Sequence, residues 1–277
     1  MAVYRLVCAN RALLKQCPIG VLVSAIQHPP LAYLDFEVPE NEVDRLEQWC
    51  LENHVDYATP GFNRSDIGLL AMDMDSTLIT IECIDEIADF IGAKGKVAAI
   101  TEASMQGQIK FTDALYQRVA LLAGLPVETL EAVYSQRLEL SPGAESMLAG
   151  FKAAGTYTLL VSGGFKFFTD RLKAQLGLDE AHANVLEVSE GRLTGRIVGD
   201  VLDGAAKAKH VQRVRTALQS QVSRGKRAIA VGDGSNDRLM FAEVDAGVAY
   251  HAKPVLEAIA THHIRHGGLD TLLAFFP

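Results

Sequence analysis

Short runs of apolar residues alternate with longer amphipathic stretches through most of the chain. The runs that are short enough to be buried strands are residues 67–72, 156–161, 228–231, 246–249 and 262–265. Helical patterns lie between them, for example at 141–155 and 165–176, and each of these closes at a glycine. Buried strands that alternate with helices favour a parallel sheet covered on both faces. We therefore expect an α/β fold with a Rossmann-like parallel sheet.

Two segments interrupt this alternation. Residues 82–139 have a helical pattern throughout, with one apolar stripe that includes Ile84 and Ile87. Residues 183–198 have the pattern of a hairpin. An insertion directly after the first strand is well placed to cover the carboxyl edge of the sheet, so we expect a helical cap at about 80–140.

The beginning of the chain has a different pattern. Residues 4–8 and 32–38 are strand-like, and residues 40–54 have helical periodicity. Residues 59–65 are rich in turn-forming types, which is typical of a linker. We therefore expect a small α+β domain at 1–65 ahead of the larger α/β domain.

Composition and charge narrow the classes of protein. The chain has 277 residues, and its 26 basic and 34 acidic side chains give a formal charge of −8. Nucleic-acid binders need clustered positive charge, so we expect no nucleic-acid partner. No apolar run approaches the roughly 18 residues of a membrane span, and the N-terminus has no secretory signal pattern. Because the four cysteines also lack CxxC spacing, we expect a cytoplasmic protein with reduced thiols and no membrane contact.

Two acids follow the first strand, in the sequence Asp73-Met-Asp75-Ser-Thr77. Ligands of open α/β sheets bind outside the carboxyl ends of the strands, where both acids can face one crevice. One carboxylate can attack phosphorus and carry an aspartyl-phosphate, while the other gives a proton to the leaving alcohol. Taken alone, the motif is equally compatible with an Asp-rich turn.

Two further strand ends carry candidate ligands. Ser162-Gly163 can hold phosphate through a hydroxyl and free backbone N–H groups, although ordinary strand-to-helix turns have the same composition. Asp233-Gly-Ser-Asn236-Asp237 supplies hard oxygen ligands, which suit one Mg²⁺ ion. The alternative for this second motif is an Asx-rich turn with Asp237 as a helix cap.

These motifs together predict a single metal site. We expect its ligands to be the Asp73 carboxylate, the main-chain carbonyl of Asp75 and the Asp233 carboxylate, because Mg²⁺ takes one or two carboxylates and fills its shell with other oxygens. Asn236 and Asp237 would support the site or contact the substrate.

A lysine is the remaining part that phosphoryl transfer needs. Lys207 and Lys209 lie early in a predicted helix, where either could cancel charge on phosphoryl oxygens. By composition the two are equal candidates, and an ordinary surface role is the alternative for both. With a lysine included, the chain offers a nucleophile, an acid, an anion cradle, a cation and metal ligands, and this combination favours phosphoryl transfer.

The order of these motifs resembles the haloacid dehalogenase superfamily of aspartyl phosphatases. The likeness covers roughly residues 66–277 and is strongest to the bacterial members that act on phosphoserine. It is carried by the segments 72–77, 81–87, 161–165 and 249–254, in addition to the motifs above. The resemblance implies a parallel core sheet with a helical cap, a nucleophilic Asp73, an acid–base Asp75 and one Mg²⁺ ion. The first 65 residues loosely resemble ACT-like regulatory domains.

The resemblance also implies roles for four residues of the cap. Glu82 would bind the ammonium group of the substrate, and Arg118 would bind its carboxylate, for which a guanidinium has the matching bidentate geometry. Met105 and Phe111 would help to close the pocket. Without the resemblance, Glu82 is typical of an acid at a helix N-terminus and Arg118 of a solvated helix face.

The activity that the resemblance implies is hydrolysis of O-phospho-L-serine to L-serine and phosphate, the last step of serine biosynthesis. Ser162, Gly163, Lys207 and Asn236 would hold the phosphoryl group, with Thr77 and Asp237 in support. One alternative is a relative that acts on another small phosphate ester or transfers the group to another alcohol. A signalling module that keeps phosphate on Asp73 is less favoured, because it has no need of a second acid or a large cap. A homodimer is compatible with these expectations.

Overall fold

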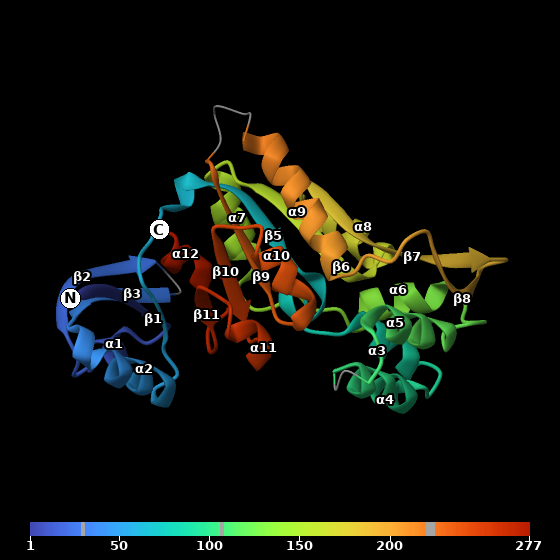
Figure 1. The fold of residues 1–277 in the computed structure, drawn as a ribbon, viewed down its shortest axis with the longest axis horizontal. Helices are drawn as coiled ribbons and strands as arrows, with labels where there is room; N and C mark the ends of the chain where they lie inside the picture. Colours follow the sequence, from blue (N-terminus) through green and yellow to red (C-terminus); the bar gives the residue numbers. More distant parts are fainter. Residues whose placement is uncertain (29–30, 106–107, 220–224) are drawn as a thin grey trace.

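The chain forms two separate β-sheets with helices around them, as the computed structural model in Figure 1 shows. The structure describes residues 1–28, 31–105, 108–219 and 225–277. Within those residues, no helix combines the length and the apolar character that a membrane span requires.

The larger sheet is parallel except at one edge. Its strands are β5 (Ile67–Met72), β6 (Tyr157–Phe165), β7 (Glu180–Ser189), β8 (Arg192–Val198), β9 (Arg227–Gly232), β10 (Ala246–Tyr250) and β11 (His262–Ile264). They lie in the order β11-β10-β9-β5-β6-β7-β8, and only the β7–β8 pair is antiparallel. The predicted α/β class, parallel sheet and hairpin are therefore confirmed.

Helices cover both faces of this sheet. They are α7 (Ala144–Ala153), α8 (Lys166–Leu176), α9 (Gly204–Gln219), α10 (Arg238–Phe241), α11 (Pro254–Glu257) and α12 (Thr271–Phe275). Side chains alternate along β5, so that Leu69 and Ala71 pack with α9 and α10, whereas Leu70 and Met72 pack with α7, α8 and α12. This burial on both faces explains why the strand is a continuous apolar run rather than an alternating one.

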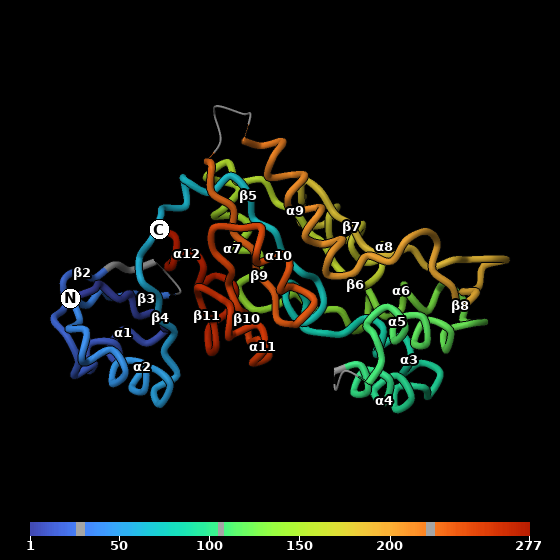
Figure 2. Tube along the Cα trace, in the orientation of Figure 1, coloured from blue at the N-terminus to red at the C-terminus, as the bar shows by residue number. Residues whose placement is uncertain are grey.

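A helical insertion follows β5 and a short helical turn, η3 (Met74–Leu78). Its helices are α3 (Cys83–Asp89), α4 (Lys94–Met105), α5 (Phe111–Ala120) and α6 (Glu128–Gln136). The segments that enter and leave it pair with each other, because the Thr80 N–H donates to the Glu139 carbonyl and the Ser141 N–H to the Leu78 carbonyl, both at 3.0 Å. The helical cap that the pattern predicts is present, and Figure 2 shows its chain path beside the sheet.

The β7–β8 hairpin also reaches the cap. The Leu193 carbonyl accepts from the Gly124 N–H, and the Leu193 N–H donates to the Leu125 carbonyl, both at 2.8 Å. The hairpin therefore contacts α5 and the segment that joins α5 to α6 (Figure 1), while residues 189–192 at its turn are exposed.

The smaller sheet is antiparallel, with the order β2-β3-β1-β4. Its elements are β1 (Ala2–Cys8), α1 (Arg11–Leu14), β2 (Val21–His28), β3 (Leu31–Val38), α2 (Val43–Glu52) and β4 (Asp56–Ala58). The sequence pattern does not predict β2, because Val21, Leu22 and Val23 do not alternate with polar residues. In the structure all three side chains are exposed. The domain boundary at residue 65 and the ACT-like character stay predictions.

A buried ion pair joins this sheet to the rest of the protein. Arg5 donates to both carboxylate oxygens of Asp35, at 2.7 and 2.9 Å, and also to the carbonyl of Ala274 in α12 at 2.8 Å. Burial opposes the charged form of Asp35, but hydrogen bonds from Arg5 and Ser24 outweigh it and lower the pKa of Asp35. The ionised form of Asp35 is therefore favoured by folding.

This pair predicts a pH-dependent contribution to stability. An acid with a pKa lowered by folding stabilises the native state above its unfolded pKa of about 4, and that contribution is lost as the pH falls through the native pKa. We expect Asp35→Asn to melt at a lower temperature than wild type at pH 7, with a difference that narrows below about pH 4. Thermal melts of both proteins from pH 3 to pH 7 test this, with exposed Asp200→Asn as the control. A difference that does not change with pH would contradict it.

Candidate active site

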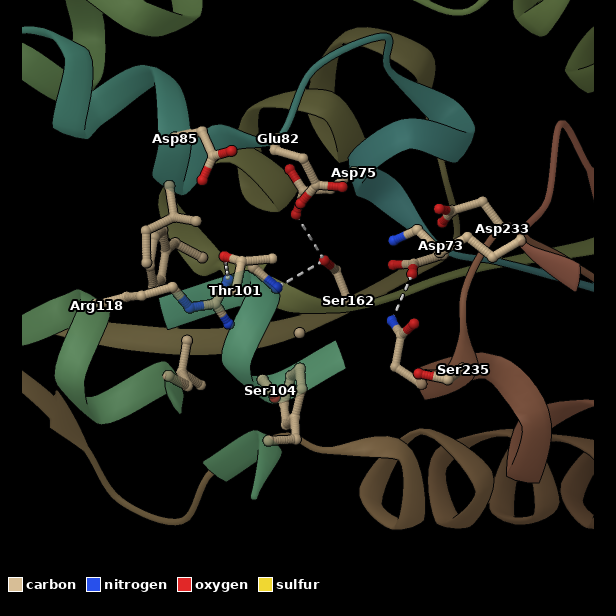
Figure 3. A pocket seen from close by; sticks show the side chains of 18 residues that line it. Asp73, Asp75, Glu82, Asp85, Thr101, Ser104, Arg118, Ser162, Asp233 and Ser235 are labelled. Atoms are coloured by element: carbon tan, nitrogen blue, oxygen red, sulfur yellow. Dashed lines mark hydrogen bonds between the residues drawn. The ribbon is translucent and has the colours of Figure 1, made fainter. Parts of the chain in front are cut away.

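A cavity of about 300 Å³ lies between the cap and the carboxyl ends of β5, β6 and β9. Nine of the residues that the sequence singles out line it: Asp73, Asp75, Glu82, Phe111, Arg118, Ser162, Gly163, Asp233 and Asn236. Figure 3 shows the acidic side chains and Arg118 facing this common space. The structure thus brings together residues that are up to 163 positions apart in the sequence.

Asp73 is held in a fixed orientation directly after β5. The residue is 3% exposed, and one of its carboxylate oxygens accepts from the Met74 N–H at 2.7 Å. The other oxygen contacts the Lys207 ammonium at 2.5 Å and accepts from the Asn236 amide at 3.0 Å. Both oxygens are thus fixed by the protein, and the residue cannot rotate freely within the cavity.

Lys207 lies fully buried behind Asp73, in the first turns of α9. Its ammonium also donates to Asp237 at 2.8 Å, so one cation lies between two carboxylates. Burial alone would lower the pKa of Lys207, but the charges of Asp237 and Asp73 outweigh it and raise that pKa. Lys209 is exposed. The structure therefore places Lys207, and not Lys209, beside the first acid.

A left-handed residue curls the chain so that Asp75 also faces the cavity. Ser76 has a φ of +54°, and its hydroxyl donates to Glu82 at 2.7 Å. One oxygen of Asp75 accepts from the Cys83 N–H at 2.9 Å, and the other lies 3.5 Å from the Ser162 hydroxyl. Burial, with the charge of Glu82 second, raises the pKa of Asp75 to about 7. A carboxyl group with this pKa can exist in both protonation states near neutrality.

The last residues of β6 leave no room for a side chain at Gly164. A Cβ on Gly164 would lie 2.8 Å from the Met74 side chain and closer still to the Asp75 carboxylate. Strand β6 continues to Phe165, with a break in its pairing to β7 after Val161, instead of ending at residue 161. This irregular stretch leaves Ser162 and Gly163 at the floor of the cavity.

Three carboxylates, those of Asp73, Asp233 and Asp237, lie within 4.8 Å of one another. Both oxygens of Asp237 are already engaged, one by Lys207 and the other by the N–H groups of Asp233 and Gly234 at 3.2 Å. Within the described part of the chain, the carboxylate of Asp233 accepts one long hydrogen bond, 3.3 Å, from Thr77. Burial and the charges of Asp73 and Asp237 raise the pKa of Asp233 to about 8. This cluster fits a divalent cation, with Asp73 and Asp233 as the available carboxylates.

The far side of the cavity is formed by the cap. Arg118 donates to the Thr101 hydroxyl at 3.4 Å and to the Ala114 carbonyl at 3.3 Å, and burial lowers its pKa. Glu82 is exposed at the mouth of the cavity, although protein surrounds its carboxylate closely enough to raise its pKa. An acid immediately before α3 and a guanidinium from α5 therefore face the same space.

The resemblance expects two apolar cap residues, Met105 and Phe111, to help close the pocket, and the structure places the side chain of Phe111 there. Phe111 lines the cavity, and its ring comes within 3.3 Å of the position that a Cβ on Gly163 would take. Met105 is the last residue of α4, and its side chain lies outside the described part of the structure.

The cavity also contains polar residues to which sequence reasoning gives no role. They are Asp85, Thr101, Ser104, Ser235 and Lys253. Asp85 and Lys253 lie inside segments that resemble the family, and this resemblance is the sequence signal that could have identified them as cavity residues. Thr101 could be found only through its contact with Arg118, because it lies 17 residues away in the sequence.

The chain is similar in sequence and in fold to several known proteins. A family model of haloacid dehalogenase-like hydrolases matches residues 70–242. The phosphoserine phosphatase of Polaromonas sp. is 51% identical over 224 residues, which cover 79% of this chain and 94% of that protein. The crystal structure of a probable phosphoserine phosphatase from Vibrio cholerae aligns with a TM-score of 0.86 at 32% identity, over 99% of this chain and 86% of that one. A substrate-bound phosphoserine phosphatase aligns with a TM-score of 0.70 at 36% identity, over 76% of this chain and 99% of that one.

The fold and the site define an α/β enzyme whose acidic site lies at the strand ends under a helical cap. The family match spans more than half of the 277 residues. The chain therefore belongs to the haloacid dehalogenase-like hydrolase family.

Proposed function

We propose that this protein is a Mg²⁺-dependent phosphoserine phosphatase, which hydrolyses O-phospho-L-serine to L-serine and phosphate. The observation that carries the proposal is a single cavity in which Asp73 and Asp75 face Glu82 and Arg118. A carboxylate and a guanidinium match the ammonium and carboxylate groups of an amino acid. The activities named for the similar proteins support the same substrate and a role in serine biosynthesis.

Asp73 and Asp75 have different roles in the proposed reaction. Asp73 attacks phosphorus in line, while Asp75 gives its proton to the departing serine oxygen. The pKa of about 7 keeps part of Asp75 protonated near neutrality. Once deprotonated, Asp75 takes a proton from the water that hydrolyses the aspartyl-phosphate. The Ser162 hydroxyl and the Gly163 N–H donate to the phosphoryl oxygens, and Lys207 offsets their charge.

The acidic cluster fits one Mg²⁺ ion. Burial, together with the charges of Asp73 and Asp237, raises the pKa of Asp233, and a bound cation would favour the ionised form of this cluster. Asp73 and Asp233 would hold the ion together with the main-chain carbonyl of Asp75, while Asp237 stays with Lys207. When bound, Mg²⁺ would neutralise charge on the phosphoryl group and on Asp73.

Phosphate release tests the function directly. Purified protein is incubated with O-phospho-L-serine and Mg²⁺, with phosphothreonine, a sugar phosphate and an EDTA arm in parallel. Metal-dependent release selective for phosphoserine is the expected result. Release from another ester would keep the chemistry and reject the substrate. The absence of release from every ester would favour a phosphotransferase or a phosphate-holding module, which trapping of phosphate on Asp73 would then distinguish.

Arg118 should determine selectivity rather than chemistry. We expect Arg118→Lys to raise KM for phosphoserine by about 10-fold or more, with a smaller change in kcat, because one ammonium cannot replace a bidentate guanidinium. Phosphoethanolamine lacks the carboxylate, so its kcat/KM should hardly change. Steady-state kinetics on both esters make the comparison, with Arg171→Lys on α8 as a control outside the cavity. Equal losses on the two esters would reject the assignment.

Cytoplasmic location and a homodimeric state are further parts of the proposal. They remain predictions from the sequence and the resemblance.

A further inference from the structure

A buried asparagine outside the cavity contacts two segments that build it. Asn184 lies on β7 and is 2% exposed. Its amide nitrogen donates to the Gly163 carbonyl at 2.8 Å, and its amide oxygen accepts from the Leu202 N–H at 2.7 Å. Each end of the amide therefore holds a different stretch of backbone.

The first contact fixes the direction in which Ser162 can donate. The Gly163 carbonyl and the Gly164 N–H belong to one planar peptide group, so Asn184 sets the orientation of both. The Gly164 N–H in turn donates to the Ser162 hydroxyl oxygen at 2.8 Å. While its oxygen accepts from Gly164, the Ser162 hydroxyl donates into the cavity, toward the Asp75 carboxylate at 3.5 Å.

The second contact fixes the start of the helix that carries Lys207. Leu202 precedes Asp203, whose carboxylate caps α9 by accepting from the N–H groups of Ala205 and Ala206 at 3.0 Å. The Asp203 carbonyl accepts from the Lys207 N–H at 2.9 Å. A single side chain therefore connects the hydroxyl donor of one strand end to the buried ammonium of α9.

We propose that Asn184 is a positioning residue, which sets the spacing between the Ser162–Gly163 donors and Lys207 around the phosphoryl group. The proposal rests on the proposed function in assigning those groups to phosphate. It predicts that Asn184 acts on the phosphate half of the substrate and leaves the amino-acid half, bound by Glu82 and Arg118, unaffected.

The test compares the two products as ligands. Asn184→Asp keeps the acceptor for Leu202 but places a carboxylate oxygen against the Gly163 carbonyl. Calorimetry with inorganic phosphate and Mg²⁺ should show affinity weakened by about 10-fold, the scale of one lost buried hydrogen bond. Inhibition by L-serine should stay within about twofold of wild type. Thr156→Val is the matched control, because Thr156 is also buried and donates one hydrogen bond, to the Ile67 carbonyl, away from the cavity.

The pH dependence of phosphate affinity distinguishes a positioning role of Asn184 from a general loss of structure. Once protonated, the carboxyl group introduced by Asn184→Asp would regain a donor for the Gly163 carbonyl. The phosphate affinity of this variant relative to wild type should therefore recover as the pH falls. Asn184→Ser, studied in parallel, has no such group and should show no recovery.

Two results would overturn the proposal: unchanged phosphate affinity in Asn184→Asp and Asn184→Ser, or equal weakening of phosphate and L-serine. Failure of the proposed function is seen separately, as wild-type protein that binds phosphate but does not cleave phosphoserine.

Discussion

Asp73→Asn should abolish turnover and leave the protein folded. An amide cannot form the aspartyl-phosphate, so we expect kcat to fall by about 10⁴-fold or more, the scale on which removal of a nucleophile acts. The folded state should tolerate the change, because Lys207 keeps Asp237 as its anionic partner and the amide oxygen of the new side chain can still accept from the Met74 N–H. We expect the melting temperature to stay within about 4 °C of wild type.

Asp245→Asn gives the opposite result and is the matched control. Asp245 lies outside the cavity and accepts from Arg215 at 2.7 Å and from the Ala228 N–H at 2.8 Å. Its loss should lower the melting temperature and leave kcat unchanged. Phosphate release measures kcat for both variants, and thermal unfolding measures their melting temperatures. If Asp73→Asn kept more than about one percent of the wild-type rate, another residue would have to be the nucleophile.

Lys207→Met should cost both stability and activity. The side chain is fully buried between Asp73 and Asp237, so its removal leaves two carboxylates without their cation. Breaking such a buried pair typically costs about 3–5 kcal/mol. The rate should also fall by about 10²–10³-fold, because the buried cation beside Asp73 then no longer offsets the phosphoryl charge. Urea unfolding measures the first loss, and steady-state kinetics measure the second.

A double variant separates these two losses. Asp237→Asn added to Lys207→Met removes one uncompensated charge and keeps an acceptor for the N–H groups of Asp233 and Gly234. We expect much of the stability to return while the rate stays low. A recovery of both together would mean that Lys207 serves only to hold the fold.

The residues at the carboxyl ends of the strands could be predicted from the sequence, because short-range patterns along the chain reveal where buried strands end. Buried parallel strands are continuous apolar runs, and their carboxyl ends share one edge, so Asp73, Ser162 and Asp233 had to lie near one another. The choice between Lys207 and Lys209 could not be made in this way. It depends on which face of α9 is buried, and both lysines are equally compatible with a helix.

The contacts that the cap makes with the cavity could not be predicted from short-range sequence patterns. Glu82 immediately precedes α3 and Arg118 lies on α5, so their meeting depends on how these two helices pack over the sheet. Family resemblance supplied that information where spacing could not. Asn184 was missed for a related reason, since its partners are 18 and 21 residues away and nothing in the hairpin pattern singles it out.

The bond between the hairpin and the cap limits how the enzyme can admit its substrate. The Leu193 backbone is bonded to Gly124 and Leu125 of the cap, while the base of β7 is paired with β6 in the core. A cap that lifts must therefore either break these bonds or carry the hairpin tip with it. In the second case the hairpin itself has to bend, and its pairing is irregular between Leu186 and Val188, between its two attachments.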